Sequence, residues 1–402
     1  MEKHERAGEF FRSVLTDVLD DLLDQVPSYQ VPRYLSAEFK SDEVKQSLRS
    51  ISQVYKKGLS SPYIRSDWDD AANRCAYVFL YLMHHCNIVF SSLQSNLSEI
   101  SADWRYKYNL KVCSIGGGPG SDLLGLTTFL RLNQMFPSAL RCLVLDLYPN
   151  WKETWDRIHT CIPGDFKVAY QKCDVVRDTT VSTEVRDFIR EADMLTLVKS
   201  FSAMSAFFRA SYQSGGDFLR KILRELKPGC FVLYIDNNND GDNQFRREFA
   251  LRVGLEVVYE SRGIKTVPSG AYSPTIRKYC RLLDFSPMRS CDVNIQLFRK
   301  KYPAIPSLNI NYEFYSYSPH SFNNPPLIFS SAKRSAKFPQ RTLARFPETT
   351  ILHHQRRKAM THPRVAPEPS RDPRGPSPFE VVLIVGVLAA LFIGSLIRNY
   401  LK

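Results

Sequence analysis

The chain contains 402 residues, of which 44% are hydrophobic and 12% aromatic, enough apolar material for a globular protein with a substantial core. Its formal net charge of +13 is concentrated in residues 331–402, and the nearly neutral residues 1–330 argue against an extended nucleic-acid groove there. Nine cysteines without CxxC spacing exclude a recognisable zinc or disulfide framework, so no metal site is expected. Because no long apolar run follows the charged first residues, we expect no secretory signal and a reducing, cytosol-facing location.

Residues 1–105 are predicted to form a mainly helical domain. Apolar residues recur at helical spacing over 9–26, and a second helix, capped by Ser66, is expected over 67–93. The second segment is apolar nearly all round, which predicts a helix buried on all sides. It contains His-His-Cys at 84–86. Because adjacent residues point in different directions on a helix, we interpret these three as core residues rather than metal ligands.

Residues 106–330 are predicted to form one domain in which strands alternate with helices. This alternation specifies a mostly parallel, doubly wound α/β sheet. The long stretch over 262–290, between the last two strands, is predicted to be a lid or a substrate-facing insertion. Strands are expected at 111–115, 140–147, 166–173, 193–199, 230–236, 254–261 and 292–299, and helices at 121–135, 184–190, 218–226 and 244–252.

The end of the chain has a different composition. Residues 331–378 are basic, rich in Pro, Ser and His, and without periodicity, which predicts a disordered linker. Within 379–402, the uncharged residues 381–397 would span roughly 26 Å as a helix, against a hydrocarbon core of about 30 Å. Small residues that could pair two such helices in a bilayer repeat at Gly386, Ala390 and Gly394.

These features predict a transmembrane tail anchor in the cytosol-facing endoplasmic reticulum or mitochondrial outer membrane. A buried C-terminal helix of the soluble domain is the alternative. A protein without this tail would be soluble, in the cytoplasm or the nucleus.

The most informative motif is Val-Cys-Ser-Ile-Gly-Gly-Gly-Pro-Gly-Ser-Asp at 112–122, where a strand joins a helix. Glycines let a ligand approach the backbone closely, and the helix N-terminus offers unpaired N–H groups. The dinucleotide pattern GxGxxG would require glycine or alanine at position 121, which is Ser121. The pattern GxGxG is met instead, by Gly116, Gly118 and Gly120.

At this motif the sequence resembles the class I S-adenosylmethionine-dependent methyltransferase family, over about residues 105–300. The resemblance implies a Rossmann-like seven-stranded sheet and S-adenosylmethionine as the cofactor. It implies that Asp146, at the end of the second strand, holds the ribose hydroxyls and that Asp174 meets the adenine amino group. The fourth strand, ending at Lys199, is expected to border the methyl donor. The implied cofactor-binding residues are Ser114, Gly116, Gly117, Gly118, Gly120, Asp146, Leu147, Cys173, Asp174 and Lys199.

No motif identifies the methyl acceptor, and no catalytic residue is assigned. After the fourth strand the chain lacks the Asp/Asn-Pro-Pro-aromatic motif of many amine methyltransferases and the nucleophilic Cys of RNA cytosine enzymes. Residues 236–238, Asp-Asn-Asn, are candidates to orient a substrate group, with plain loop polarity as an equal alternative. A fainter resemblance over 113–126, to fungal methyltransferases of large-subunit ribosomal RNA uridine, makes RNA the leading substrate class. A small-molecule methyltransferase at a membrane surface and a catalytically inactive cofactor-binding scaffold stay open.

Overall fold

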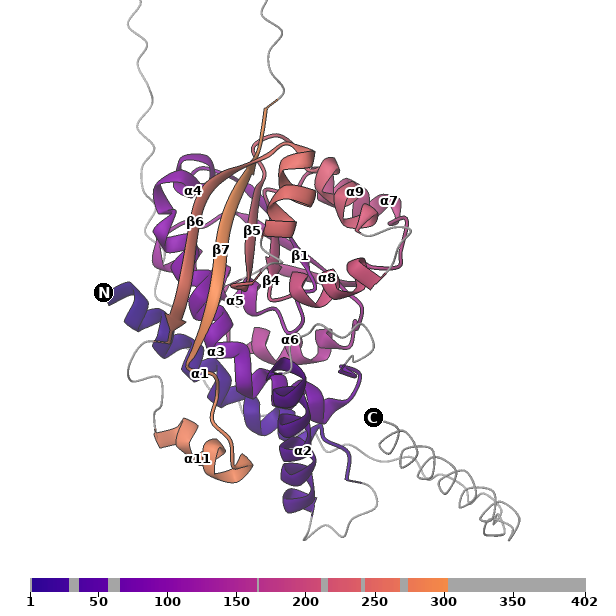
Figure 1. Cartoon of the computed structure of the whole chain (residues 1–402). Coiled ribbons are helices and arrows are strands. Elements are labelled where there is room, and N and C mark those ends of the chain that lie inside the picture. The colour runs from indigo at the N-terminus through magenta and orange to yellow at the C-terminus, as the bar shows by residue number, and fades with distance from the viewer. Residues whose placement is uncertain are drawn as a thin grey trace, which may run out of the picture. The chain divides into compact units, whose positions relative to one another are not determined.

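Seven strands form a single mixed sheet in the order β3-β2-β1-β4-β5-β7-β6 (Figure 1). Strands β1 to β5 run parallel to one another, whereas β7 is antiparallel and lies between β5 and β6. The predicted seven-stranded, mostly parallel α/β sheet is therefore confirmed. In this computed structural model the strands are β1 (Asn109–Ile115), β2 (Ala139–Asp146), β3 (Lys167–Lys172), β4 (Met194–Val198), β5 (Phe231–Asn237), β6 (Leu255–Thr266) and β7 (Ser290–Lys300).

The structure describes residues 2–28, 36–56, 66–164, 166–210, 216–239, 243–267 and 274–302, all of which fall in one compact unit. The expected linker over 331–378 and the expected membrane segment over 381–397 lie outside the described residues. The tail anchor, and the helix pairing through its small residues, therefore stay predictions.

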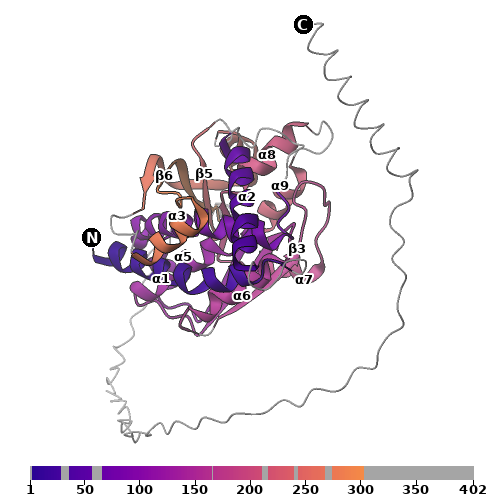
Figure 2. The same ribbon diagram turned by 90° about the horizontal axis from the view of Figure 1, so that it is seen from below.

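Helices cover both faces of the sheet, and each face has its own hydrophobic core. Figures 1 and 2 agree in placing α7, α8 and α9 together on one side, apart from α1. The first core is built with α1 (Glu2–Asp24), α2 (Ser36–Lys56), α3 (Ala71–Ser95), α4 (Leu97–Trp104), α5 (Ser121–Leu132), α6 (Trp151–Thr160) and α11 (Pro274–Leu283). The second is built with α7 (Thr183–Arg190), α8 (Phe201–Ala210), α9 (Asp217–Glu225), a π-helix at Phe245–Ala250 and a 3-10 turn at Leu251–Val253.

The N-terminal helices belong to the first of these cores. Helix α3 packs against both α1 and α5, and residues of α1 to α4 form one continuous apolar cluster with residues of β1 and β2. The sequence predicts a separate helical domain over residues 1–105. In the structure these helices share their core with the sheet and fall in the same compact unit.

Helix α3 is buried almost all round, as its composition predicts. Among the described helices it alone is long and apolar enough to cross a membrane, and 89% of that apolar stretch is buried inside the fold. Its apolar surface is therefore used by the protein core. The helix begins after Asp70, whose carboxylate accepts the backbone N–H of Asn73 at 2.9 Å, so the predicted cap at Ser66 is wrong.

The stretch between the last two strands differs from its prediction. Strand β6 continues to Thr266, and α11 then packs against α1 and α2. The hydroxyl of Tyr279 donates to the carbonyl oxygen of Thr16 at 3.4 Å, and Lys278 forms an ion pair with Asp20. For the described part of this stretch the lid prediction is therefore wrong: it is docked on the N-terminal helices.

Candidate functional site

The glycine turn joins β1 to α5 at the carboxyl edge of the sheet. Gly116, Gly118 and Gly120 have φ angles of +62°, +51° and +80°, a left-handed conformation that favours glycine. Gly117 is required for a different reason, because a Cβ there would lie 2.2 Å from the hydroxyl oxygen of Ser114. Side chains therefore do not fit on the inner side of the turn, and its backbone stays uncovered where a ligand would approach.

A buried carboxylate supports the turn from beneath. Asp122, in the first turn of α5, accepts hydrogen bonds from the hydroxyl of Ser114 at 2.5 Å, from the hydroxyl of Thr196 and from the N–H of Leu123. Burial raises the pKa of Asp122, and the hydrogen bonds from Ser114 and Thr196 oppose that rise. Ser114 therefore faces the protein interior and joins the turn to its neighbour strand.

Asp146 ties the turn to the end of β2, which lies beside β1. One carboxylate oxygen accepts the N–H of Gly118 at 3.0 Å, and the other accepts the N–H of Tyr148 at 2.9 Å. The side chain is nearly buried, with 8% of the residue exposed. Burial raises the pKa of Asp146 to about 6, against the lowering effect of these backbone hydrogen bonds. The carboxyl group is therefore poised to change its charge in weak acid.

A pocket of about 200 Å³ opens at the carboxyl ends of β1, β2 and β4, around this turn. The structure brings seven of the ten predicted residues to its wall: Gly116, Gly118, Asp146, Leu147, Cys173, Asp174 and Lys199. The other three, Ser114, Gly117 and Gly120, support the turn without lining the pocket.

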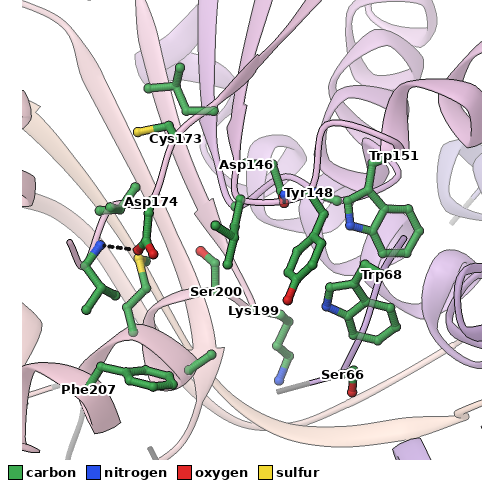
Figure 3. A pocket seen from close by; sticks show the side chains of 18 of the residues that line it. Ser66, Trp68, Asp146, Tyr148, Trp151, Cys173, Asp174, Lys199, Ser200 and Phe207 are labelled. Atoms are coloured by element: carbon green, nitrogen blue, oxygen red, sulfur yellow. Dashed lines mark hydrogen bonds between the residues drawn. The ribbon is translucent and has the colours of Figure 1, made fainter. Parts of the chain in front are cut away.

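The pocket has two chemically different sides, which Figure 3 shows. On one side lie Cys173, Asp174 and Phe207. There the carboxylate of Asp174 accepts the N–H of Val176 at 3.0 Å, which fixes the loop after β3. On the other side lie Tyr148 and two tryptophans.

Sequence reasoning missed most of the aromatic side. The rings of Trp68, Tyr77 and Trp151 contact one another, with centroids 5.1 to 5.4 Å apart. They come from the segment before α3, from α3 itself and from the start of α6, and all three line the pocket. The position of Trp151, five residues after Asp146, was the only sequence signal that could have found one of them.

Arg74 holds the segment that carries Trp68. One guanidinium nitrogen donates to the carbonyl oxygens of Trp68 and Asp69, at 3.0 and 2.8 Å, and the other pairs with Glu153 at 3.0 Å. The Arg74 side chain is only 5% exposed. The N-terminal part of the chain therefore completes the pocket wall, and an ion pair between the buried Arg74 and the exposed Glu153 joins it to α6.

Lys199 follows β4 in a left-handed conformation, with φ of +56°. Its ammonium group donates to the amide oxygen of Asn237 at 2.7 Å and to the sulfur of Cys291 at 3.2 Å. Asn237 ends β5, and Cys291 is the second residue of β7, so the ends of three strands meet here. Among Asp236, Asn237 and Asn238, the candidates from the fifth strand, only Asn237 contacts this lysine, whereas Asp236 accepts the N–H and hydroxyl of Ser202.

Comparisons with known proteins give low similarities. No family model and no curated protein matches the sequence. The chain is similar to a structure from Pyrococcus horikoshii proposed to be an RNA methyltransferase, at 15% identity over 54% of this chain and 85% of that one, with a TM-score of 0.34. A proposed class I S-adenosylmethionine-dependent methyltransferase from Listeria monocytogenes gives 10% identity over 75% and 90%, with a TM-score of 0.35. A phosphoethanolamine N-methyltransferase from Haemonchus contortus, solved with S-adenosylhomocysteine, gives 13% over 55% and 58%, with a TM-score of 0.29. These likenesses concern the fold and leave the substrate open.

Proposed function

We propose that this chain is an S-adenosylmethionine-dependent methyltransferase whose cofactor binds in the pocket at the glycine turn. One observation carries the proposal: the bare backbone of the turn and the carboxylate of Asp146 face the same pocket, at the end of adjacent parallel strands. In open α/β sheets, ligands bind outside the carboxyl ends of the strands where the strand order reverses, and here β1 connects to β2 on one side and pairs with β4 on the other.

The residues present fit this cofactor. Each oxygen of Asp146 accepts one backbone N–H, and a carboxylate oxygen has a second lone pair that is suited to a ribose hydroxyl. Leu147 and Cys173 offer apolar contacts for an adenine ring, and Asp174 offers an acceptor for its amino group. When bound, S-adenosylmethionine would supply an activated methyl group on a sulfonium leaving group.

The chain itself must align the acceptor and keep water away. Methyl transfer demands mainly that the nucleophile be held in line with the methyl carbon. Trp68, Tyr77 and Trp151 form a fixed aromatic wall beside the turn, held in place by Arg74. A wall of this kind excludes water and presents flat surfaces against which an acceptor can stack.

RNA is the acceptor class that we propose, on the faint sequence resemblance to ribosomal RNA uridine methyltransferases. The test is transfer of tritium from methyl-labelled S-adenosylmethionine by the full chain to total RNA, with a lipid extract and a metabolite extract in parallel. Label in RNA, lost in Asp146→Ala, is the expected result. Label found only in lipid or metabolites would contradict RNA as the acceptor and would support a small-molecule methyltransferase at a membrane surface. Cofactor binding without transfer to any of the three would favour the inactive scaffold.

We also propose that the C-terminal segment over 381–397 anchors the protein in a membrane, on its uncharged composition alone. The test is flotation of the full chain with lipid vesicles, compared with a chain that ends at residue 378. Flotation of the full chain only is expected, and equal behaviour of the two would contradict the anchor.

A further inference from the structure

The ammonium group of Lys199 is a pocket cation whose partners are neutral. Its two hydrogen-bond partners are the amide oxygen of Asn237 and the thiol of Cys291, and none of the ion pairs between described residues includes Lys199. An ammonium group has three N–H donors, so one remains after these two contacts. A cation held in a pocket wall with a donor to spare is suited to an anion.

Neither of the two carboxylates in the same pocket forms an ion pair with Lys199 among the described residues. Burial and the nearby Lys199 lower the pKa of His84 to about 4, and burial lowers that of His85 well below its usual range, so both rings are uncharged near neutral pH. Burial raises the pKa of the Tyr81 phenol above its usual range. Carboxylates line the pocket at Asp146 and Asp174. The titratable groups that the surrounding elements contribute are Tyr77, Tyr81, His84 and His85 of α3, Tyr148 after β2, and Cys291 of β7.

The aromatic side of the pocket adds a shape requirement. Figure 3 shows Lys199 with Trp68 and Tyr148 on one side, and with Asp174 and Phe207 on the other. Aromatic walls favour flat partners, which stack on them with little loss of conformational freedom. An acceptor on this side of the pocket would meet flat rings and one ammonium group.

Building on the proposed function, we propose that Lys199 binds the acceptor, and that this acceptor is a planar compound with a weakly acidic O–H or N–H group that attacks as its anion. An amine fits this place poorly, because its methylated product carries a positive charge beside the ammonium of Lys199. An ammonium within about 4–6 Å lowers the pKa of an acid by roughly 1–3 units, which enriches the attacking anion at neutral pH.

The methyl transfer needs no further reagent, because every bond and proton is accounted for. The acceptor releases its proton to water, and its freed electron pair forms the new bond to the methyl carbon. The bond between carbon and sulfur breaks with its electron pair left on sulfur. Lys199 keeps its proton throughout, so its role is to bind and stabilise the anion.

The probe for this inference is 4-nitrophenol, a planar, weakly acidic compound whose anion is coloured. It is titrated with pH in the presence of excess full chain saturated with S-adenosylhomocysteine. We expect the bound probe to ionise about one pH unit lower than the free probe, which is a tenfold change in its ionisation constant. Lys199→Gln should abolish this shift, Lys199→Arg should restore most of it, and Lys167→Gln, at the exposed start of β3, should retain it. An unshifted or unbound probe with the wild-type chain, or an equal shift with Lys199→Gln, would overturn the proposal.

A second measurement separates this role from contact with the cofactor. S-adenosylhomocysteine carries a carboxylate, whereas 5′-methylthioadenosine lacks the amino-acid part. The proposal predicts that Lys199→Gln changes the affinity for either compound less than about threefold, which corresponds to under ~1 kcal/mol. Selective loss of S-adenosylhomocysteine affinity would instead assign Lys199 to the cofactor carboxylate and overturn the proposal. If the wild-type chain binds neither compound, the proposed function itself fails, which is a distinct outcome.

Discussion

Lowering the pH from about 7.5 to about 5 should weaken the binding of S-adenosylhomocysteine roughly tenfold, because Asp146 must be charged to hold the ribose hydroxyls well. Burial raises the pKa of this carboxyl group from 3.8 to about 6. Nearly all Asp146 side chains are then charged at about pH 7.5, whereas only about a tenth of them are charged at about pH 5.

The direction of the effect follows from the hydrogen bonds. Hydroxyl donors favour the charged carboxylate, so binding lowers the pKa of Asp146 and releases a proton below about pH 6. Affinity therefore rises with pH through the pKa of the unliganded protein. Burial lowers the pKa of His84 to about 4, below this pH range, so His84 stays largely uncharged throughout.

Calorimetric titration of the full chain at the two pH values measures the effect. Repeating it in two buffers of different ionisation enthalpy counts the protons released. The matched variant Asp146→Asn keeps the shape of the side chain but cannot ionise, so its affinity should be lower and independent of pH. Equal wild-type affinities at the two pH values, or a pH dependence that survives in Asp146→Asn, would refute the reasoning.

Three substitutions test the support of the pocket. Gly120→Ala should lower the free energy of unfolding by about 3 kcal/mol, measured with denaturant, because φ is +80° and a Cβ would lie 2.5 Å from the ring of Trp155. Asp122→Ala should lower it by roughly 2–3 kcal/mol, because two buried hydroxyl donors lose their acceptor. Arg74→Met should weaken S-adenosylhomocysteine binding about threefold to tenfold, measured by calorimetry, because Trp68 loses the contact that fixes its backbone.

Matched controls separate these effects from general damage. Gly164 also has a left-handed φ, of +120°, but its Cβ would meet nothing within 4 Å, so Gly164→Ala should cost about 1 kcal/mol from strain alone. Asp156→Ala removes an exposed carboxylate and should cost less than about 0.5 kcal/mol. Arg157→Met, on the exposed side of α6, should leave cofactor affinity unchanged. If the stability or the cofactor affinity of a variant changes no more than that of its control, the role given to that residue is contradicted.

The sheet was predictable because each strand is a short apolar run bounded by turn residues. Six strands begin and end within two residues of their predicted positions, namely β1, β2, β3, β4, β5 and β7. The predicted end of β6 lies five residues too early, because residues 262–266 alternate between exposed and half-buried at a sheet edge. Helices α2, α4, α6, α8 and α11 were missed, since their burial depends on the sheet and on the other helices rather than on a strong local pattern.

Only part of the candidate site could be predicted from the sequence, namely the part that contains a local motif. The glycine turn and the residues after β2 and β3 follow from strand ends in the sequence. Ser114, two positions before the first glycine, does not line the pocket, because its hydroxyl group donates to the buried carboxylate of Asp122. Asn237 and Cys291 meet Lys199 only because β7 runs antiparallel beside β5, and the chain order contains no signal of that pairing.

The wall at Trp68 could not be predicted for a similar reason. Trp68 reaches the pocket because the buried Arg74 on α3 holds its backbone and because Trp151 offers a ring to pack against. Contacts between segments about 80 residues apart depend on how α3 and α6 dock on the sheet. A single sequence shows which residues are present but not which of them come into contact in the fold.

The measurement that most directly tests the central claim is equilibrium dialysis of labelled S-adenosylmethionine against the full chain near neutral pH. The structure predicts about one equivalent bound, displaced by S-adenosylhomocysteine and not by a nicotinamide dinucleotide, since position 121 is Ser where the dinucleotide turn needs glycine or alanine. A folded chain that binds no label, or one from which the dinucleotide displaces it equally well, would contradict a methyl-donor pocket at the glycine turn.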